Sequence, residues 1–238
     1  MLNKVIMDIN GKADDMQQAK IEEKPVTETQ PDVTAGVYVR GHIKIFDPDS
    51  GEVYVDKANA IHYENMSEAI ASALSHRDKQ YMYEMHFGNG GTAVDSTGVI
   101  TYLVPNTTSQ AAGLYNPTYA KIVDDTDTSN NPDPTHNKMQ VRHVPGNAYS
   151  DIIISCLLDY GEPATQSVFD NSTTLNDTYT FDELGIKARS TDGTSGLAST
   201  GKLLTHVIFH PVQKSLNRLI QIDYTVRIQT LTNLSSIG

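Results

Sequence analysis

The sequence contains no tryptophan and a single cysteine, Cys156, among its 238 residues. One cysteine cannot form an intramolecular disulfide. Cys156 stands in the apolar run IIISCLL at residues 152–158, which predicts a buried thiol that packs as a small hydrophobic group. A free thiol fits a reducing compartment. The start of the chain lacks the apolar stretch of a secretion signal, and no segment approaches the roughly 20 apolar residues that span a membrane. We therefore expect a cytoplasmic product with no membrane partner.

Basic residues are also scarce, because 18 Lys and Arg stand against 29 Asp and Glu and give a formal net charge of −11. Proteins that bind duplex DNA neutralise phosphates with a basic face. No dense run of Lys or Arg is present. The charge balance thus predicts no direct nucleic-acid partner, and it favours solubility at high local concentration.

Motifs that carry catalysis are missing as well. The chain has no nucleophile elbow, P-loop or dinucleotide fingerprint. His206 and His210 are four residues apart in a strand-like segment, which places them roughly 13 Å apart and too far for one metal ion. Asp182 and Glu183 are sequence neighbours, and neighbours in a strand face opposite ways, so they predict no acid–base pair. Other histidines show no metal-ligand spacing: His62, His86, His136 and His143. We predict a non-enzymatic protein with no catalytic, cofactor-binding or metal-binding residues.

Three polar segments invite a ligand interpretation and are better explained as turns. The DPDSG sequence at residues 47–51 resembles the start of a calcium loop, but the twelfth position, which needs an acidic ligand, is Ala58. The GNGG sequence at residues 88–91 leads from one strand to another and carries no lysine, unlike a phosphate-binding loop. The acidic stretch at residues 124–134 is rich in oxygen ligands without fixed spacing. It predicts a solvated loop and leaves cation binding open.

What the chain does contain is strand-like alternation between turn sequences. Hydrophobic residues make up only 38% and charged residues 20%, and much of the remainder is Thr, Ser, Asn and Gly. Apolar and polar residues alternate over residues 37–55, which predicts a hairpin, and again over residues 219–230. The run at residues 151–158 predicts a strand that is buried on both faces. These patterns predict a mainly β fold, an antiparallel β-sandwich-like core with one short α-helix packed on it and long polar loops.

The predicted helix covers residues 66–76. Asn65 fits the N-cap and Glu68 stands three residues later, which together form a capping-box pattern. Met66, Ile70, Ala73 and Leu74 fall at helical spacing and predict one apolar stripe that faces a sheet.

The composition changes near Gly36 and divides the chain into two parts. Residues 1–36 are rich in charged residues and glutamine, which predicts an extended or disordered N-terminal arm. Residues 37–238 form a single β-rich domain with large loops at residues 106–138 and 161–200. Deletion of residues 1–36 is expected to leave a folded core. The long closing strand is expected to suit a subunit contact or the augmentation of a neighbouring sheet.

Four segments carry a resemblance to a known class of proteins. They are VDKANAIHYEN at residues 55–65, MHFGNGGT at 85–92, GVITYL at 98–103 and HVIFHP at 206–211. These segments, within a likeness over most of residues 37–231, resemble small structural proteins of tailed-bacteriophage virions. Related proteins stand at the neck, collar, tail or baseplate. The resemblance implies a virion protein made in the bacterial host cytoplasm, with no catalytic residues to carry over.

Three functions remain open at this point. The first is a virion structural protein of the head–tail junction (neck or collar) or of the tail and baseplate. Its partners are copies of itself and the portal, connector, tail or capsid proteins. The second is a capsid decoration protein, which should bind expanded shells. The third is a receptor-tip or glycan-binding module, which the missing tryptophan disfavours. Position in the particle, oligomer number and host do not follow from the sequence.

Overall fold

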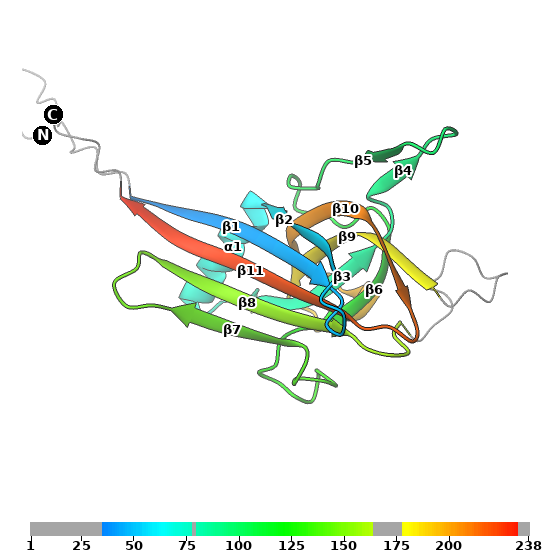
Figure 1. The fold of residues 1–238 in the computed structure, drawn as a ribbon. Helices are drawn as coiled ribbons and strands as arrows, with labels where there is room; N and C mark the ends of the chain where they lie inside the picture. Colours follow the sequence, from blue (N-terminus) through cyan, green and yellow to red (C-terminus); the bar gives the residue numbers. More distant parts are fainter. Residues whose placement is uncertain (1–34, 78–79, 164–177, 233–238) are drawn as a thin grey trace, which may run out of the picture. The chain divides into compact units, whose positions relative to one another are not determined.

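The computed structural model describes residues 35–77, 80–163 and 178–232, which include 11 strands and one α-helix (Figure 1). The predicted arm at residues 1–36 lies outside the described residues except for its last two positions, which begin the first strand. The elements are β1 (Ala35–Phe46), β2 (Val53–Ile61), α1 (Tyr63–Ser75), β3 (Met82–Gly88), β4 (Thr92–Val94), β5 (Ile100–Tyr102), β6 (Pro117–Ile122), β7 (Lys138–His143), β8 (Tyr149–Leu158), β9 (Thr178–Ala188), β10 (Leu203–Ser215) and β11 (Ile220–Thr232).

Nine of the strands form one curled antiparallel sheet in the order β6-β3-β9-β10-β2-β1-β11-β8-β7. We call β1, β11, β8 and β7 the β1–β11 half, and β10, β9, β3 and β6 the β9–β10 half. β2 joins the two halves, because it pairs with β1 along six positions and with β10 at two. The mainly β, sandwich-like fold predicted from the sequence is confirmed.

The hydrophobic core lies between the two halves of the curled sheet. Ile43, Ile222 and Tyr224 enter it from the β1–β11 half, and Phe87 and Phe181 enter it from the β9–β10 half. All five side chains are fully buried. The Tyr224 hydroxyl donates to Oγ1 of Thr205 on β10 at 2.6 Å, so the two halves are joined by a hydrogen bond within the core as well as by apolar packing.

The β1–β11 half follows the predicted alternation closely. β1 and β2 form the expected hairpin around residues 47–51. Along β11, Ile220, Ile222, Tyr224 and Val226 are buried, and the residues between them are half-buried on the other face. Burial along β8 is less complete than predicted, because Ile152 and Ile153 are only half-buried.

The closing strand does not present a free edge. β11 pairs with β1 on one side and with β8 on the other, so its predicted use for augmenting a neighbouring sheet is wrong. The outer strands of the nine-stranded sheet are β6 and β7. The hydrophobic alternation correctly indicated the strand but carried no information on its position in the sheet.

Both predicted loops contain a strand of the main sheet. β6 lies within residues 106–138, and β9 lies within residues 161–200 and pairs with β3 and β10 in the β9–β10 half. Part of the second loop, residues 164–177, falls outside the described residues. β9 escaped prediction because its buried polar residues Asp182 and Glu183 interrupt the apolar pattern that marks a strand.

The helix begins earlier than predicted and has a different cap. His62 is the N-cap, and its Nδ1 accepts the N–H of Asn65 at 3.2 Å. Asn65 is fully buried within the helix and donates through Nδ2 to the carbonyl oxygen of Leu203 at 2.9 Å. The predicted capping box is therefore wrong, because a buried position and a partner on β10 fix the role of Asn65.

The apolar stripe of the helix is only partly as predicted. Met66 and Ala69 are buried in the core, Ile70 is half-buried, and Leu74 is 85% exposed. Gln80 follows the helix and donates to Glu68, which also pairs with Lys202. Glu68 thus joins the helix to its surroundings instead of capping it.

Candidate functional site

The loop at residues 88–91 is held by two acidic side chains of β9. Asp182 accepts the backbone N–H groups of Gly91 and Thr92, both at 2.9 Å, and Glu183 accepts that of Gly90 at 3.1 Å. A Cβ atom on Gly88 would lie 2.4 Å from Glu183 Oε1 and 2.6 Å from a backbone oxygen. The glycines are thus needed because the backbone passes directly against carboxylates. The predicted structural turn has a specific anchor that sequence reasoning missed.

Glu183 also forms a buried pair with His206 on β10. His206 Nε2 lies 3.0 Å from Glu183 Oε2, and both side chains are fully buried. The backbone N–H of Asn106 donates to His206 Nδ1 at 2.8 Å, so the neutral imidazole carries its proton on Nε2 and donates it to Glu183. The N–H groups of Tyr115 and Asn116 donate to the same carboxylate. This one pair therefore fastens both ends of the loop at residues 106–116.

The pKa of Glu183 reflects this crowding of donors. Burial raises the pKa, but the hydrogen bonds from His206 and from the Asn116 and Tyr115 backbones outweigh burial, and the pKa lies below its ordinary value. Glu183 is thus held as a carboxylate that accepts four donors.

A second carboxylate–imidazole pair lies on β3. Glu84 Oε1 and His86 Nε2 are 3.2 Å apart in the interior but are not aligned for a hydrogen bond. Glu84 Oε2 accepts the N–H of Gly196 at 2.8 Å and so holds the loop before β10. Burial lowers the pKa of His86 more than the Glu84 carboxylate raises it. In the sheet register His86 is level with Gly185 of β9, and Gly185 is level with His206.

The two pairs have the residue types of acid–base catalysis but not its access. A general base must reach the proton that it removes from a substrate. Glu183 and His206 have no exposed surface, and the donors around them belong to the protein backbone. The four-residue set therefore anchors three loops to the outer side of the β9–β10 half. Their arrangement supports structural stability.

The histidines of the predicted strand and helix do not form a common metal site. His206 and His210 are on one strand, with His206 buried and His210 exposed, and His62 caps the helix. Within residues 35–77, 80–163 and 178–232, no group of three His, Cys, Asp or Glu side chains is arranged to hold a metal ion. The Asp47 carboxylate of the DPDSG turn accepts the N–H groups of Asp49 and Ser50 and pairs with Arg218.

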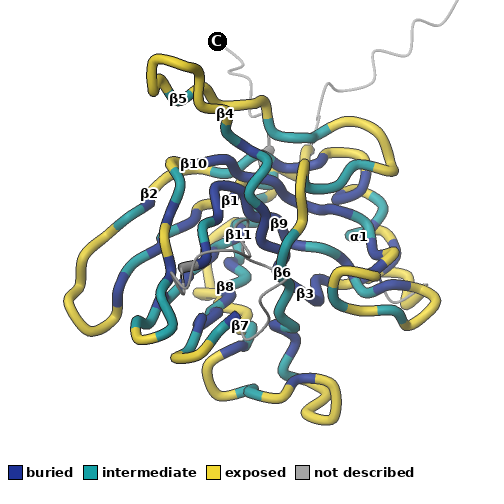
Figure 2. Tube along the Cα trace, turned by 90° about the vertical axis from the view of Figure 1, so that its right-hand side faces the viewer, coloured by how far each residue is buried: buried dark blue, intermediate teal, exposed yellow. Residues whose placement is uncertain are grey.

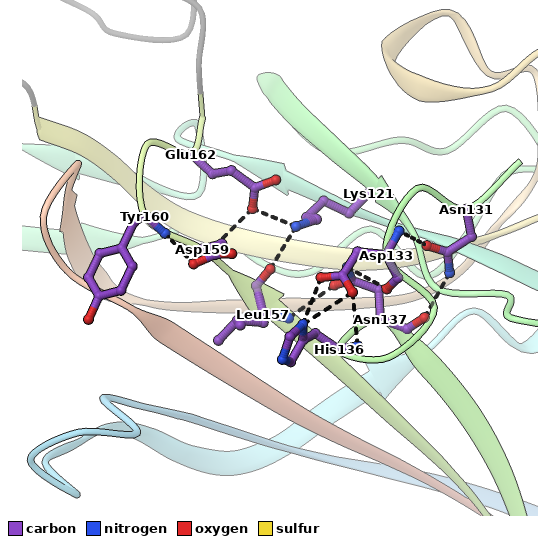
Figure 3. Close-up of polar contacts among 9 residues, drawn as sticks. All are labelled: Lys121, Asn131, Asp133, His136, Asn137, Leu157, Asp159, Tyr160 and Glu162. Atoms are coloured by element: carbon purple, nitrogen blue, oxygen red, sulfur yellow. Dashed lines mark hydrogen bonds and ion pairs between the residues drawn. The ribbon is translucent and has the colours of Figure 1, made fainter. Parts of the chain in front are cut away.

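The acidic loop (residues 124–134) was predicted to be a solvated loop, but hydrogen bonds of its side chains hold it against the rest of the protein (Figure 3). Asn131 is buried and donates to the carbonyl oxygens of Asp124 and Asn137 at 3.0 and 2.7 Å. Asn137 in turn accepts the N–H of Leu157 in β8 at 3.1 Å. Asp133 pairs with His136 at 2.9 Å. Two buried amide side chains therefore fix this loop against the end of β8.

An ion pair joins the edge strand β6 to the same region (Figure 3). Lys121 Nζ donates to the carbonyl oxygen of Leu157 at 2.7 Å and contacts Glu162 Oε2 at 2.5 Å. Glu162 also accepts the N–H of Asp159 at 2.9 Å. The Lys121 side chain thus joins the edge of the β9–β10 half to β8. Nearby, Cys156 is fully buried, and burial raises its pKa to about 12, as expected for an inert core thiol.

The surface has two features suited to contacts with other proteins. β4 and β5 form a separate two-stranded hairpin that extends away from the main sheet (Figure 1) and is mostly exposed (Figure 2). On and beside it, five apolar side chains are exposed: Val94, Val99, Tyr102, Leu103 and Val104. A groove of about 520 Å³ lies between α1 and β7, and its lining is mainly apolar, including Met66, Ile70, Met139 and Ile152.

No protein-family model, curated protein or solved structure matches this chain. No helix among the described residues is long and apolar enough to cross a membrane.

Proposed function

We propose that this chain is a non-enzymatic structural component of a tailed-phage virion. It assembles through contacts between copies, and with other virion proteins, at the head–tail junction or in the tail and baseplate. The sequence resemblance supplies the class of particle. The single structural observation that supports assembly is the β4–β5 hairpin, which carries exposed apolar side chains away from the sheet.

The hairpin exposes apolar side chains that take no part in the hydrophobic core. Exposed apolar side chains that occur singly are ordinary, but a contiguous group marks a contact site. The strands β4 and β5 are three residues each, and a two-stranded hairpin of this size is marginally stable alone in water. A neighbouring subunit that covers Val94, Val99 and Tyr102 removes apolar surface from water and stabilises the hairpin.

The rest of the structure supplies the rigid body that such a role needs. The loops that connect the strands of the β9–β10 half are anchored by buried side chains, as Glu183 does for the loop at residues 106–116. A rigid body presents the hairpin in one orientation, and repeated heterologous contacts of this kind close into rings. The oligomer is therefore expected to be a ring.

The test is the mass of the purified protein in solution, measured by light scattering over a range of concentrations. The wild type is expected to form a closed oligomer. A Val94→Asn, Val99→Asn double variant is expected to shift this equilibrium to smaller species at unchanged circular dichroism.

Leu74→Asn is the matched control, because Leu74 is equally apolar and 85% exposed but lies on α1. It is expected to assemble like the wild type. A wild type that stays monomeric at every concentration, and does not enter particles when virion proteins are supplied, would contradict the proposal. A trimer that binds only expanded shells would indicate capsid decoration instead.

A further inference from the structure

Three arginines lie in one row across the outer face of the β1–β11 half. The cross-strand register joins Arg142 of β7 to Asp151 of β8, Asp151 to Arg227 of β11, and Arg227 to Arg40 of β1. Directly paired residues of antiparallel strands project on the same face of the sheet. We call Arg40, Arg142 and Arg227 the arginine row. It gathers positive charge on one face of a chain whose net charge is −11.

One carboxylate does not neutralise this row. Asp151 is buried and accepts from Arg227 Nε at 2.6 Å and from Arg142 at 3.1 Å. Arg227 also lies over the Tyr149 ring, 3.8 Å from its centroid. Arg40 is exposed, and its side chain has no hydrogen bond or ion pair with the residues that the structure describes, although it stands directly opposite Arg227. Like charges directly opposite each other destabilise a sheet, so an anionic partner would relieve the row.

The row borders a hollow of about 660 Å³ with a polar lining. All three arginines line it, together with residues of β1 and β2 such as His42 and Ala58. The Arg142 side chain is 63% exposed and the Arg227 side chain 26%. The guanidinium groups are therefore accessible from solvent and have space for carboxylates of another protein.

We propose that the arginine row receives the acidic loop of a second copy of this chain. Charge complementarity selects this partner, because residues 122–137 contain four aspartates and no Lys or Arg. Asp127 is exposed and Asp125 is half-buried. Arginine is well suited to carboxylates, since its planar group donates two parallel hydrogen bonds.

The positions of the two surfaces allow a head-to-tail contact. The acidic loop precedes Lys138, at the start of β7, whereas Arg142 stands near the end of the same strand. The loop and the turn after β7 lie at opposite ends of this part of the sheet (Figure 1). Donor and acceptor surfaces are therefore different patches, and each copy can use both at once. The inference rests on the proposed function and names a contact between copies in addition to the one at the β4–β5 hairpin.

The test uses the full-length chain with two sets of substitutions, whose mass is measured by analytical ultracentrifugation. Arg40→Glu with Arg142→Glu reverses the row while Arg227 remains to neutralise the buried Asp151. Asp125→Asn with Asp127→Asn removes charge from the loop at constant side-chain size. Each double variant alone is expected to self-associate at least tenfold more weakly than the wild type. Arg77→Glu, exposed at the end of α1, is the matched charge-reversal control and is expected to associate normally.

Mixing the two double variants gives the decisive result. The mixture contains one intact row and one intact loop on different chains, so it is expected to form dimers at concentrations at which neither double variant associates alone. Raising the salt concentration from about 0.05 to 0.5 M is expected to dissociate these dimers, because exposed charges are screened. Normal assembly of either double variant overturns this inference and leaves the proposed function standing. A wild type that never associates with itself overturns this inference, and it overturns the proposed function as well only if the chain also fails to enter particles when virion proteins are supplied.

Discussion

The two halves of the curled sheet use their outer faces differently. In the β1–β11 half the outer face meets water, and β11 accordingly alternates between buried apolar residues and half-buried polar ones such as Asp223 and Arg227. In the β9–β10 half loops cover the outer face, and every residue of β3 from Met82 to Gly88 is buried. There Glu84, His86, Glu183 and His206 occupy the positions that water-facing residues hold in the other half. The outer face of the β9–β10 half is thus covered by loops that buried charged side chains hold in place, whereas the outer face of the other half is covered by water.

This comparison predicts that the largest loss of stability follows from removal of a buried carboxylate. Glu183→Ala leaves His206 and three backbone N–H groups without their acceptor, so it is expected to lower the free energy of unfolding by about 3–5 kcal/mol. Asp223→Ala, on the outer face of β11, is the control and should cost less than about 1 kcal/mol. Urea unfolding measures both. Equal losses would show that the two faces do not differ in this way.

A smaller loss of stability is expected from a methyl group placed against the same carboxylate. Gly88→Ala sets a Cβ within 2.6 Å of a backbone oxygen, which can move only with its loop. The expected cost is about 1–3 kcal/mol, as for other overpacked sites. Gly113→Ala meets no atom within 4 Å and is the control. Thermal unfolding compares the two, and an unchanged midpoint for Gly88→Ala would mean that the loop is not held tightly.

The covered face should also make stability depend on pH. Burial lowers the pKa of His86 in the folded state, so below about pH 6.5 the unfolded chain binds the proton more readily. The free energy of unfolding is therefore expected to fall as pH falls from about 7 towards the folded pKa. His86→Gln should reduce this slope, whereas His143→Gln, exposed on β7, should not. Urea unfolding at several pH values is the measurement. Parallel slopes for all three proteins would show that His86 does not cause the pH dependence of stability.

The smallest effect is expected on the helix, where buried and water-facing positions stand side by side. Leu74→Gln changes an 85% exposed side chain and should alter the free energy of unfolding by less than about 0.5 kcal/mol. Met66→Ala, at a buried position of the same helix, should cost about 2–5 kcal/mol. Chemical denaturation of both variants is the measurement. A large loss of unfolding free energy for Leu74→Gln would indicate that another molecule covers this side chain, because it has no such contact within the single chain.

The same contrast explains which parts of the fold were predictable. Alternation predicts a strand only where one face is apolar and the other meets water, as in β1 and β11. In β9 the polar residues are buried, so their positions looked like part of a loop. The glycines at residues 88–91 indicated a close backbone approach but not its partner, because Asp182 and Glu183 are more than 90 residues away. An acidic pair inside an otherwise strand-like segment, TYTFDELGI at residues 178–186, was the only local signal.

The surface features were less predictable than the core. The sequence showed the acidic stretch and the polar alternation of the last strand, but not that three arginines from three strands share a row. Such a row depends on strand order and register, which a single sequence does not specify. The prediction of the helix cap was wrong for a related reason. Asn65 fits an N-cap by its local sequence, but its side chain donates to the carbonyl oxygen of Leu203 of β10.

The place of β11 in the sheet has a consequence for how the chain folds during synthesis. The β1–β2 and β7–β8 hairpins are each complete early, but the strand that lies between β1 and β8 is the last one described, and Ala35 pairs with Thr232. Contacts across so much sequence slow folding. While the chain is being made, β1 and β8 each expose an unsatisfied edge to other nascent chains. Assembly of the β1–β11 half must therefore wait for translation to reach β11, and a fragment that ends after β10 is expected to aggregate.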